Sequence, residues 1–167
     1  MKIETERLQL REFTLDDFEA FADLMADPEV RRYSVTGILD REQSRQYLQK
    51  ILDHYQQYGY GRYVIIDKRD NAFIGYAGFI VQEIENIKRT ELAFALKPAY
   101  WGQGFAFEAT SALCDHAFKI LNLPELISII DVENQRSISL AKRLGMHLEK
   151  DFLFHQIQAH LFVLWNR

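Results

Sequence analysis

Short apolar runs, and positions where apolar and polar residues alternate, predict the strands of this chain. Residues 6–12 place Leu8 and Leu10 between charged or polar neighbours, a period of two that is typical of a strand with one buried face. Residues 126–132 are largely apolar, as expected of a buried strand. Seven strands are predicted in this way, at residues 6–12, 61–67, 73–82, 89–96, 126–132, 146–153 and 157–165.

Apolar residues that return every three or four positions predict helices, and turn chemistry predicts where those helices end. Asp40 and Gln43 have the spacing of a capping box, in which two side chains satisfy free N–H groups at a helix start. Gly59 is the kind of residue that ends a helix. Helices are expected from Thr14 to about Met25, from Asp40 to about Tyr58, from Phe105 to Leu121 and from Asn134 to Leu144, with a short additional one opened by Asp27-Pro28.

The order of these elements predicts the fold class. A strand, helices, three antiparallel-type strands, a helix, a strand, a helix and two strands indicate an α+β (mixed α/β) fold, in which helices cover a central sheet. Loops are expected at residues 33–39 and 83–88. The sequence contains no internal repeat, low-complexity segment or linker, so residues 1–167 are expected to form a single domain.

Composition and charge argue against several classes of function. The formal net charge is -4 and there is no Lys/Arg-rich block, which does not favour nucleic acid or an anionic membrane as a partner. No apolar run approaches the roughly 20 residues of a membrane-spanning helix, and the N-terminus lacks the apolar core of a signal peptide. The one cysteine, Cys114, permits no disulfide framework, so a cytoplasmic location is expected. Both a monomer and a homodimer are compatible with the sequence.

The stretch from Glu91 to Ala106 carries the clearest candidate chemistry. An apolar strand with a carboxylate at its head is ended by Pro98 and followed by a glycine-bearing turn, WGQG, and a helix. Glycines let the backbone approach a ligand closely, and the first N–H groups of a helix have no partner inside it. This order therefore predicts a site for a phosphate group. A dinucleotide motif would need a third glycine where Phe107 stands, and the Gly-Lys-Ser/Thr of a Walker loop is absent.

Several motifs, in order, resemble one superfamily. The segment from Trp101 to Ala106 resembles the R/Q-x-x-G-x-G/A acyl-CoA signature of the GNAT N-acetyltransferases. The RimJ/RimL-type (ribosomal-protein N-terminal acetyltransferase-like) branch is similar in further stretches, which are TERL at 5–8, DPEV at 27–30, Asn134-x-x-Ser137 and LGM at 144–146. The resemblance runs over essentially the whole chain.

The chain departs from the superfamily pattern at three positions. Trp101 stands where the signature usually has Arg or Gln, and Phe107 stands where a hydroxyl residue often helps to hold the pyrophosphate. Ala141 occupies the position where many members place a tyrosine that acts as general acid. A thiol has a pKa of ~8.5, so a thiolate is a tolerable leaving group near neutral pH even without that tyrosine.

The resemblance implies that acetyl-CoA is the cosubstrate and that it lies in a splay between the strands at 89–96 and 126–132 of a mostly antiparallel, twisted sheet. Pantetheine would pair with the backbone of residues 94–96, where an N–H would also stabilise the developing oxyanion. The amides of residues 103–106 would hold the pyrophosphate. The residues expected to bind the cofactor are Phe94, Ala95, Leu96, Trp101, Gly102, Gln103, Gly104, Phe105, Ala106, Asn134 and Ser137.

Glu91 and Ser137 are the candidates for catalytic roles. Glu91 would act as the general base, directly or through a water, with a pKa raised by partial burial; the alternative is a strand-end carboxylate that faces solvent. Ser137 would hydrogen-bond or protonate the departing sulfur, or would be only a first-turn helix residue. Asn134 would contact the cofactor, although it also stands where a helix N-cap belongs. The five histidines have no metal-binding spacing such as H-E-x-x-H, so no metal is expected.

The acceptor is expected to be a primary amine. The branch suggests a protein or peptide N-terminal α-amine, whose pKa of ~7.7–8.0 leaves the base less to do than the ~10.4 of lysine. The alternatives are a small-molecule amine (a polyamine, an amino acid or an aminoglycoside) and a non-catalytic acyl-CoA-binding module. By analogy of fold, the acceptor pocket is expected near the loop at 33–39, the helix at 40–57, and Glu83 with Glu85.

Overall fold

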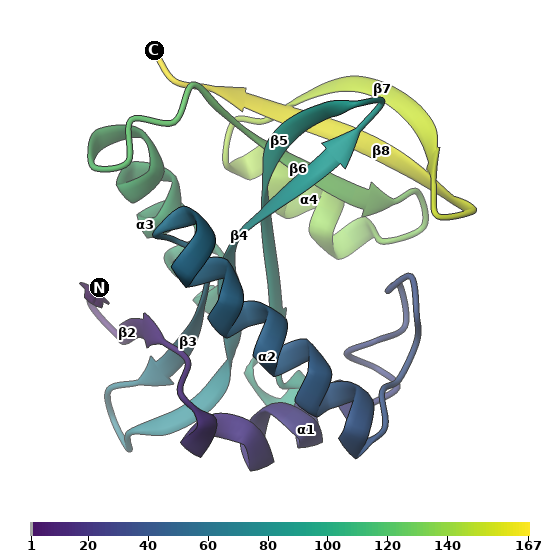
Figure 1. Ribbon diagram of the computed structural model, residues 1–167. Helices are drawn as coiled ribbons and strands as arrows, with labels where there is room; N and C mark the ends of the chain where they lie inside the picture. The colour runs from purple at the N-terminus through teal and green to yellow at the C-terminus, as the bar shows by residue number, and fades with distance from the viewer. Residues whose placement is uncertain (1) are drawn as a thin grey trace.

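The computed structural model describes residues 2–167 and is built around one sheet of eight strands (Figure 1). Its strands are β1 (Lys2–Glu4), β2 (Leu8–Glu12), β3 (Arg62–Asp67), β4 (Ala72–Ile84), β5 (Ile87–Leu96), β6 (Glu125–Asp131), β7 (His147–Phe154) and β8 (Ile157–Trp165). Their order in the sheet is β1-β2-β3-β4-β5-β6-β8-β7, and every neighbouring pair except β5 and β6 is antiparallel. The predicted fold class is therefore confirmed. The strand beyond the seven predicted is β1, which pairs with β2.

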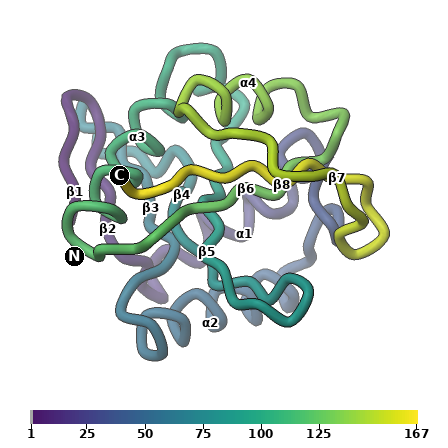
Figure 2. Tube along the Cα trace, turned by 90° about the horizontal axis from the view of Figure 1, so that it is seen from above, coloured from purple at the N-terminus to yellow at the C-terminus, as the bar shows by residue number. Residues whose placement is uncertain are grey.

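Helices cover both faces of this sheet. They are α1 (Phe18–Ala26), α2 (Arg41–Tyr58), α3 (Phe105–Lys119) and α4 (Gln135–Arg143), with short 3-10 segments at Leu15–Asp17 and Pro98–Tyr100. Seen from above, α1 and α2 lie on one side of the sheet and α3 and α4 on the other (Figure 2). One core cluster, around Phe21, Ile51 and Val64, joins α1 and α2 to the sheet, and a second, around Leu92 and Leu113, joins α3 to the opposite face.

The predicted ends of α2 are confirmed, and at each end the capping residue lies within a few positions of its partner. Asp40 and Gln43 form the expected capping box, with hydrogen bonds of 2.8 and 2.9 Å between each side chain and the other residue's N–H. Gly59 follows α2 in the left-handed conformation, with φ of 77°. The short helix expected at Asp27-Pro28 is wrong, since residues 28–33 form turns. The Arg31 guanidinium donates to the carbonyl of Gly37 and to Thr36, which folds this segment back into a loop.

The polar loop expected at residues 83–88 is also wrong. β4 continues to Ile84 and β5 begins at Ile87, so only Glu85 and Asn86 lie between the strands. Both residues have positive φ, 51° and 68°, as a tight hairpin turn requires. The Glu85 carboxylate pairs with Lys150 on β7 at 2.6 Å, which ties this turn to the far edge of the sheet.

The interruption in the sheet lies between β5 and β6. The two strands pair in parallel only at Glu91 and Ile127, and they separate beyond that point, as the predicted splay requires. Where the ladder stops, the Ser128 hydroxyl donates to the carbonyl of Leu92 at 3.0 Å. The N–H of Lys97 donates to β4, so the alternation of an antiparallel ladder turns the backbone polar groups of Leu92, Phe94 and Leu96 away from β4 and toward the gap.

Arg89 holds β5 and β6 together on the side where the two strands are still adjacent. The Arg89 side chain is 15% exposed and forms ion pairs with Glu125 on β6 (2.6 Å) and Glu149 on β7 (2.9 Å). Hydrogen bonds from Arg89 lower the pKa of Glu149. The arginine therefore joins three strands immediately before β5 and β6 separate.

We expect Arg89→Met to lower the free energy of unfolding by about 2 kcal/mol, because it removes the cation that pairs with the half-buried Glu125 carboxylate and with the more exposed Glu149 carboxylate. Thermal or urea unfolding at neutral pH measures the loss. The difference from wild type should shrink on acidification, since a carboxylate with a lowered pKa contributes stability that is lost as pH falls through its folded value. Arg41→Met is the matched control: its ion pair with Glu19 is exposed, and the expected change is within about 0.5 kcal/mol. Equal effects of the two substitutions would contradict the role given to Arg89.

Candidate functional site

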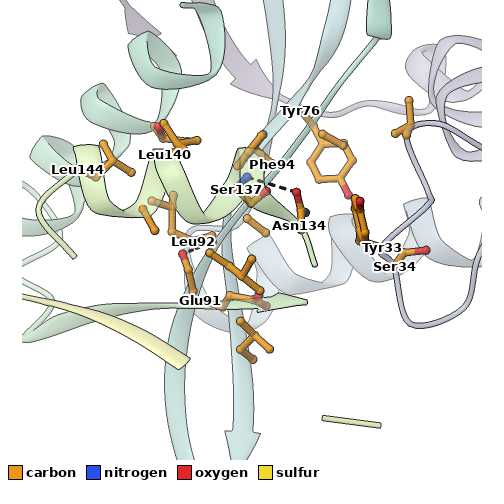
Figure 3. Close-up of a pocket in the computed structure, with 18 of the residues that line it drawn as sticks. Tyr33, Ser34, Tyr76, Glu91, Leu92, Phe94, Asn134, Ser137, Leu140 and Leu144 are labelled. Atoms are coloured by element: carbon orange, nitrogen blue, oxygen red, sulfur yellow. Dashed lines mark hydrogen bonds between the residues drawn. The ribbon is translucent and has the colours of Figure 1, made fainter. Parts of the chain in front are cut away.

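Two cavities meet where β5 and β6 separate. The smaller, about 180 Å³, lies among β5, β6, the start of α4 and the loop that carries Tyr33 and Ser34 (Figure 3). The larger, about 640 Å³, extends from the end of β5 past the glycine turn and along α4. The residues that line both cavities are Val30, Tyr33, Phe94, Ala95, Asn134, Ser137 and Leu140. This shared wall joins a narrow chamber to a long trough.

The glycine turn provides unpaired backbone donors to the trough. Gly102 and Gly104 have φ of 73° and 81°, a left-handed conformation that other residues adopt only with strain. Within residues 2–167, no backbone N–H from Gly102 to Phe107 donates a hydrogen bond to the protein, and the first such bond of α3 is made by Glu108. Unpaired N–H groups at a helix start, next to glycines, make a site suited to a phosphate group.

The predicted cofactor residues of this segment do not all line the trough. Trp101, Gly102, Gly104, Phe105 and Ala106 do. Gln103 does not, because its side-chain amide donates to the carbonyl of Ala99 at 2.9 Å. The group of Gln103 that is available to a ligand is its backbone N–H.

The N-terminal residues hold the glycine turn in place. Arg7 donates from Nη1 to the carbonyl of Gln103 (2.9 Å) and from Nε to Glu108 (2.7 Å), and its guanidinium carbon lies 4.1 Å from the centre of the Phe105 ring. Thr5 also donates to Glu108. Burial would raise the pKa of Glu108, but the hydrogen bonds from Thr5 and Arg7 outweigh it and lower that pKa. The TERL stretch thus has a structural role, because Thr5 and Arg7 join the start of α3 to the first strands.

The end of β5 forms the floor between the two cavities. Phe94 and Ala95 lie in the shared wall, and Leu96 lines the trough. The indole Nε1 of Trp101 donates to the carbonyl of Leu96 at 2.9 Å, which satisfies the last carbonyl of the strand. The Phe94 backbone, which faces the gap, has no partner on β6. An amide-containing chain could pair with it as a strand would.

Glu91 is buried in the wall of the smaller cavity. Its residue is 8% exposed, so it is not a strand-end carboxylate that faces solvent. Burial raises the pKa of this carboxyl group, and hydrogen bonds from Gln82 and the Ile129 N–H, with the charge of Arg62, oppose part of that rise. The Gln82 contact measures 3.0 Å to Oε1. A carboxylate of this kind can accept a proton closer to neutral pH than an exposed one can.

The start of α4 brings Asn134 and Ser137 to both cavities. The Asn134 Oδ1 accepts the N–H of Ser137 at 3.3 Å, so the N-cap role is present (Figure 3). Within the described chain, neither the Asn134 Nδ2 nor the Ser137 hydroxyl has a protein partner, which leaves both groups available to a ligand. Ala141 lines the smaller cavity without a hydroxyl of its own.

One of the segments where the acceptor pocket is expected, the loop at 33–39, lines a cavity. The loop expected there contributes Tyr33 and Ser34 to the smaller cavity. No residue of α2, and neither Glu83 nor Glu85, lines either cavity. Val30 was missed as a wall residue, and the DPEV stretch that contains it was the one signal for it.

Residues 2–167 offer neither a metal-binding cluster nor a membrane-spanning helix. No group of three or more His, Cys, Asp or Glu side chains in that range is arranged to hold a metal ion. None of the helices there has the length and apolar character needed to cross a membrane.

Comparison with known proteins identifies the family. The family described as "Acetyltransferase (GNAT) domain" matches residues 7–147. The chain is 36% identical over 146 residues to an uncharacterized N-acetyltransferase, p20, of Bacillus licheniformis, covering 87% of this chain and 82% of that protein. A crystal structure of an acetyltransferase from Agrobacterium tumefaciens is 30% identical, with a TM-score of 0.85 over 98% of this chain and 94% of that one.

Two further solved structures share the fold at lower identity. The ribosomal L7/L12 α-N-protein acetyltransferase RimL, in complex with coenzyme A, has a TM-score of 0.81 at 18% identity and covers 99% of this chain and 98% of its own. A spermidine N-acetyltransferase from Vibrio cholerae, in complex with CoA and spermine, has a TM-score of 0.80 at 20% identity, with 97% of each chain covered.

Glu91→Gln is expected to stabilise the protein above pH 7. Because the folded state raises the pKa of Glu91, this carboxyl group weakens folding as pH rises from its unfolded pKa to its folded pKa, by about 1.4 kcal/mol for each pH unit between the two. The gain in melting temperature should be largest near pH 8 and disappear near pH 4, where both side chains are neutral. Glu83→Gln, an exposed carboxylate on β4, is the control and should change nothing. A Glu91→Gln protein no more stable than wild type at pH 8 would contradict the burial argument.

Proposed function

The chain belongs to the GNAT family and is an N-acetyltransferase, and on that premise we propose that it moves the acetyl group of acetyl-CoA to the N-terminal α-amine of a protein or peptide. The observation that carries this proposal is the junction of the two cavities. One is a trough with unpaired amides, and the other is a chamber with a buried carboxylate. In this proposal the thioester lies at the shared wall of the two cavities. Residues 1–167 form a single domain, and the protein acts in the cytoplasm.

The cofactor is held mainly by backbone groups. The N–H groups from Gly102 to Phe107 receive the pyrophosphate, and the gap-facing backbone of Phe94 pairs with pantetheine. The free amide of Asn134 donates to the cofactor while its Oδ1 keeps capping α4. The N–H of Phe94 also polarises the thioester carbonyl and stabilises the oxyanion that forms during attack.

Acetyl transfer proceeds by direct attack. The acceptor enters the smaller cavity, Glu91 takes one proton from its ammonium group, and the neutral amine attacks the thioester carbon. A C–N bond forms, the C–S bond breaks, and the second amine proton is relayed to the departing thiolate, which leaves a neutral amide and a free thiol. The departing thiolate is protonated from the shared wall, where Ser137 and Tyr33 carry the hydroxyl groups.

The charge of the smaller cavity favours an α-amine over a polyamine. Glu91 is the carboxylate in its lining, and Arg31 is a cation in the same lining. A polyamine carries several ammonium groups, and desolvating each one is costly without a paired carboxylate. The fold is shared by acetyltransferases of both acceptor types, so a small-molecule amine is the second candidate.

Thiol release from acetyl-CoA is the direct test. The purified protein is offered N-terminal peptides, polyamines, amino acids and aminoglycosides, and the free thiol is measured. We expect release with peptides to exceed release with polyamines at least about tenfold, in line with one or more unpaired ammonium groups. A polyamine that gives the highest kcat/KM would overturn the acceptor assignment. Binding of acetyl-CoA without turnover on any acceptor would instead support a non-catalytic acyl-CoA-binding module.

Glu91→Gln separates catalysis from cofactor binding. We expect kcat to fall about 10²- to 10⁴-fold, the usual contribution of a general base, while the Kd for acetyl-CoA changes less than twofold. The wild-type rate should also fall on acidification as Glu91 is protonated, and this limb of the pH profile should be absent from the variant. Glu83→Gln is again the control, with wild-type kinetics. Equal losses of kcat and of acetyl-CoA affinity would remove Glu91 from the role of base.

A further inference from the structure

Two arginines of α4 are stacked on the aromatic residues of the glycine-turn segment. The guanidinium carbon of Arg136 lies 3.8 Å from the ring centre of Trp101, and that of Arg143 lies 3.9 Å from the ring centre of Phe107. The arginines are seven positions apart, about two helical turns, which places them on one face of α4. All four residues line the larger cavity, so one cation–π contact joins α4 to the residue before the glycine turn and the other joins it to the first turn of α3.

The two aromatic residues occupy positions at which this sequence departs from the acyl-CoA signature. An aromatic ring gives a phosphate neither a charge nor a strong hydrogen bond. The face of a ring does hold a guanidinium, by cation–π attraction and by stacking of two planar groups. Trp101 and Phe107, which differ from the signature, therefore each contact an arginine of α4.

The hydrogen-bonding edges of these guanidinium groups are unoccupied. Within residues 2–167, neither Arg136 nor Arg143 forms an ion pair with a carboxylate or a hydrogen bond to a protein acceptor. Guanidinium is planar, so it can stack on a ring through its face while its edge N–H groups bind a phosphate in bidentate fashion. The aromatic contact thus orients each arginine without using the groups that a phosphate needs.

We propose that Arg136 and Arg143 bind the phosphate groups of acetyl-CoA, and that Trp101 and Phe107 hold the two guanidinium groups in position for this. The assignment rests on the proposed cofactor and deepens it. The amides of the glycine turn supply directional donors, and the arginines supply the positive charge that backbone groups lack. The phosphate contact is divided between two helices, α3 and α4, instead of being confined to one turn.

The test compares ligands that do and do not carry phosphates. Dissociation constants for acetyl-CoA and for S-acetylpantetheine, which has no phosphate, are measured by calorimetry on wild type, Arg136→Gln, Arg143→Gln and the double variant. We expect each single substitution to weaken acetyl-CoA binding about tenfold, as for a hydrogen-bonded charged group, and to leave S-acetylpantetheine binding within twofold. The dependence of acetyl-CoA affinity on salt should also become shallower in the variants.

Matched controls separate charge from structure. Lys142→Gln removes a cation from the same helix at an exposed position outside both cavities, and it should bind both ligands as wild type does. Trp101→Phe keeps a ring under Arg136 and should stay within about threefold of wild type, whereas Trp101→Leu should weaken acetyl-CoA binding further. Arg136→Lys should not restore full affinity, because an ammonium lacks the planar fork.

The outcomes distinguish this inference from the proposed function. Wild-type protein that binds acetyl-CoA and turns it over, with both arginine variants equal to Lys142→Gln, would overturn the inference and leave the function intact. Equal loss of acetyl-CoA and S-acetylpantetheine binding would also overturn it, by showing that the arginines act only on the shape of the trough. Wild-type protein that binds no acetyl-CoA would overturn the proposed function itself.

Discussion

The separation of β5 from β6 is the constraint on which the rest of this structure depends. Backbone groups in the middle of a sheet are normally paired, and leaving them unpaired in a buried place is costly. Three contacts limit that cost here. Arg89 forms ion pairs that join the strands on one side of the gap. Ser128 donates a hydrogen bond to the carbonyl of Leu92 where the ladder ends, and the indole of Trp101 donates one to the carbonyl of Leu96. Of the β5 groups that face the gap, the N–H and carbonyl of Phe94, between the two cavities, and the N–H of Leu96 remain open.

The trough depends on contacts between parts of the chain that are far apart in sequence. Arg7 and Thr5, before β2, fasten Glu108 and the carbonyl of Gln103, about one hundred residues later. Those contacts hold the left-handed glycines in place, so that the turn lines the cavity with unpaired N–H groups before any ligand is present. Preorganised donors give up less entropy when they bind than mobile ones do. The same principle applies to the stacked Arg136 and Arg143.

Local patterns in the sequence predict most of the fold, and long-range contacts account for what they miss. Capping at Asp40 and the stop at Gly59 are predictable because the interacting groups lie within a few residues of each other. The polar residues around Glu85 and Asn86 are equally typical of a loop and of a tight turn, and only strand pairing decides between them. The segment after Asp27 has a helix-like start, and the contacts of Arg31 that fold it back are not encoded in its periodicity.

The residues of the candidate site also fall into those that local sequence patterns indicate and those that only long-range packing brings together. The turn, the carboxylate of Glu91 and the pair Asn134 and Ser137 could be named from the sequence because each belongs to a short motif. The α4 arginines could not, since their aromatic partners lie in another segment and are set by packing. For Tyr33, the sequence indicated the loop but not the side chain. Glu91 itself was identifiable, but the hydrogen bonds from Gln82 and Ile129 that offset its burial come from neighbouring strands.

The two ends of the site have opposite electrostatic requirements, and the splayed strands allow both to be met. A pyrophosphate is stabilised by open N–H groups and cations in contact with solvent, as in the trough. A carboxylate that must take a proton from an ammonium group needs a raised pKa, which a solvated, cation-rich surface would lower. Glu91 lies on β5 before the strands separate, and the glycine turn lies beyond the end of that strand. One continuous segment therefore places the proposed base in the interior and the N–H groups proposed to bind phosphate at the surface. The sheet thus keeps the Glu91 carboxylate apart from the proposed pyrophosphate site, and the backbone between them, at Phe94, is open for the thioester in the proposed complex.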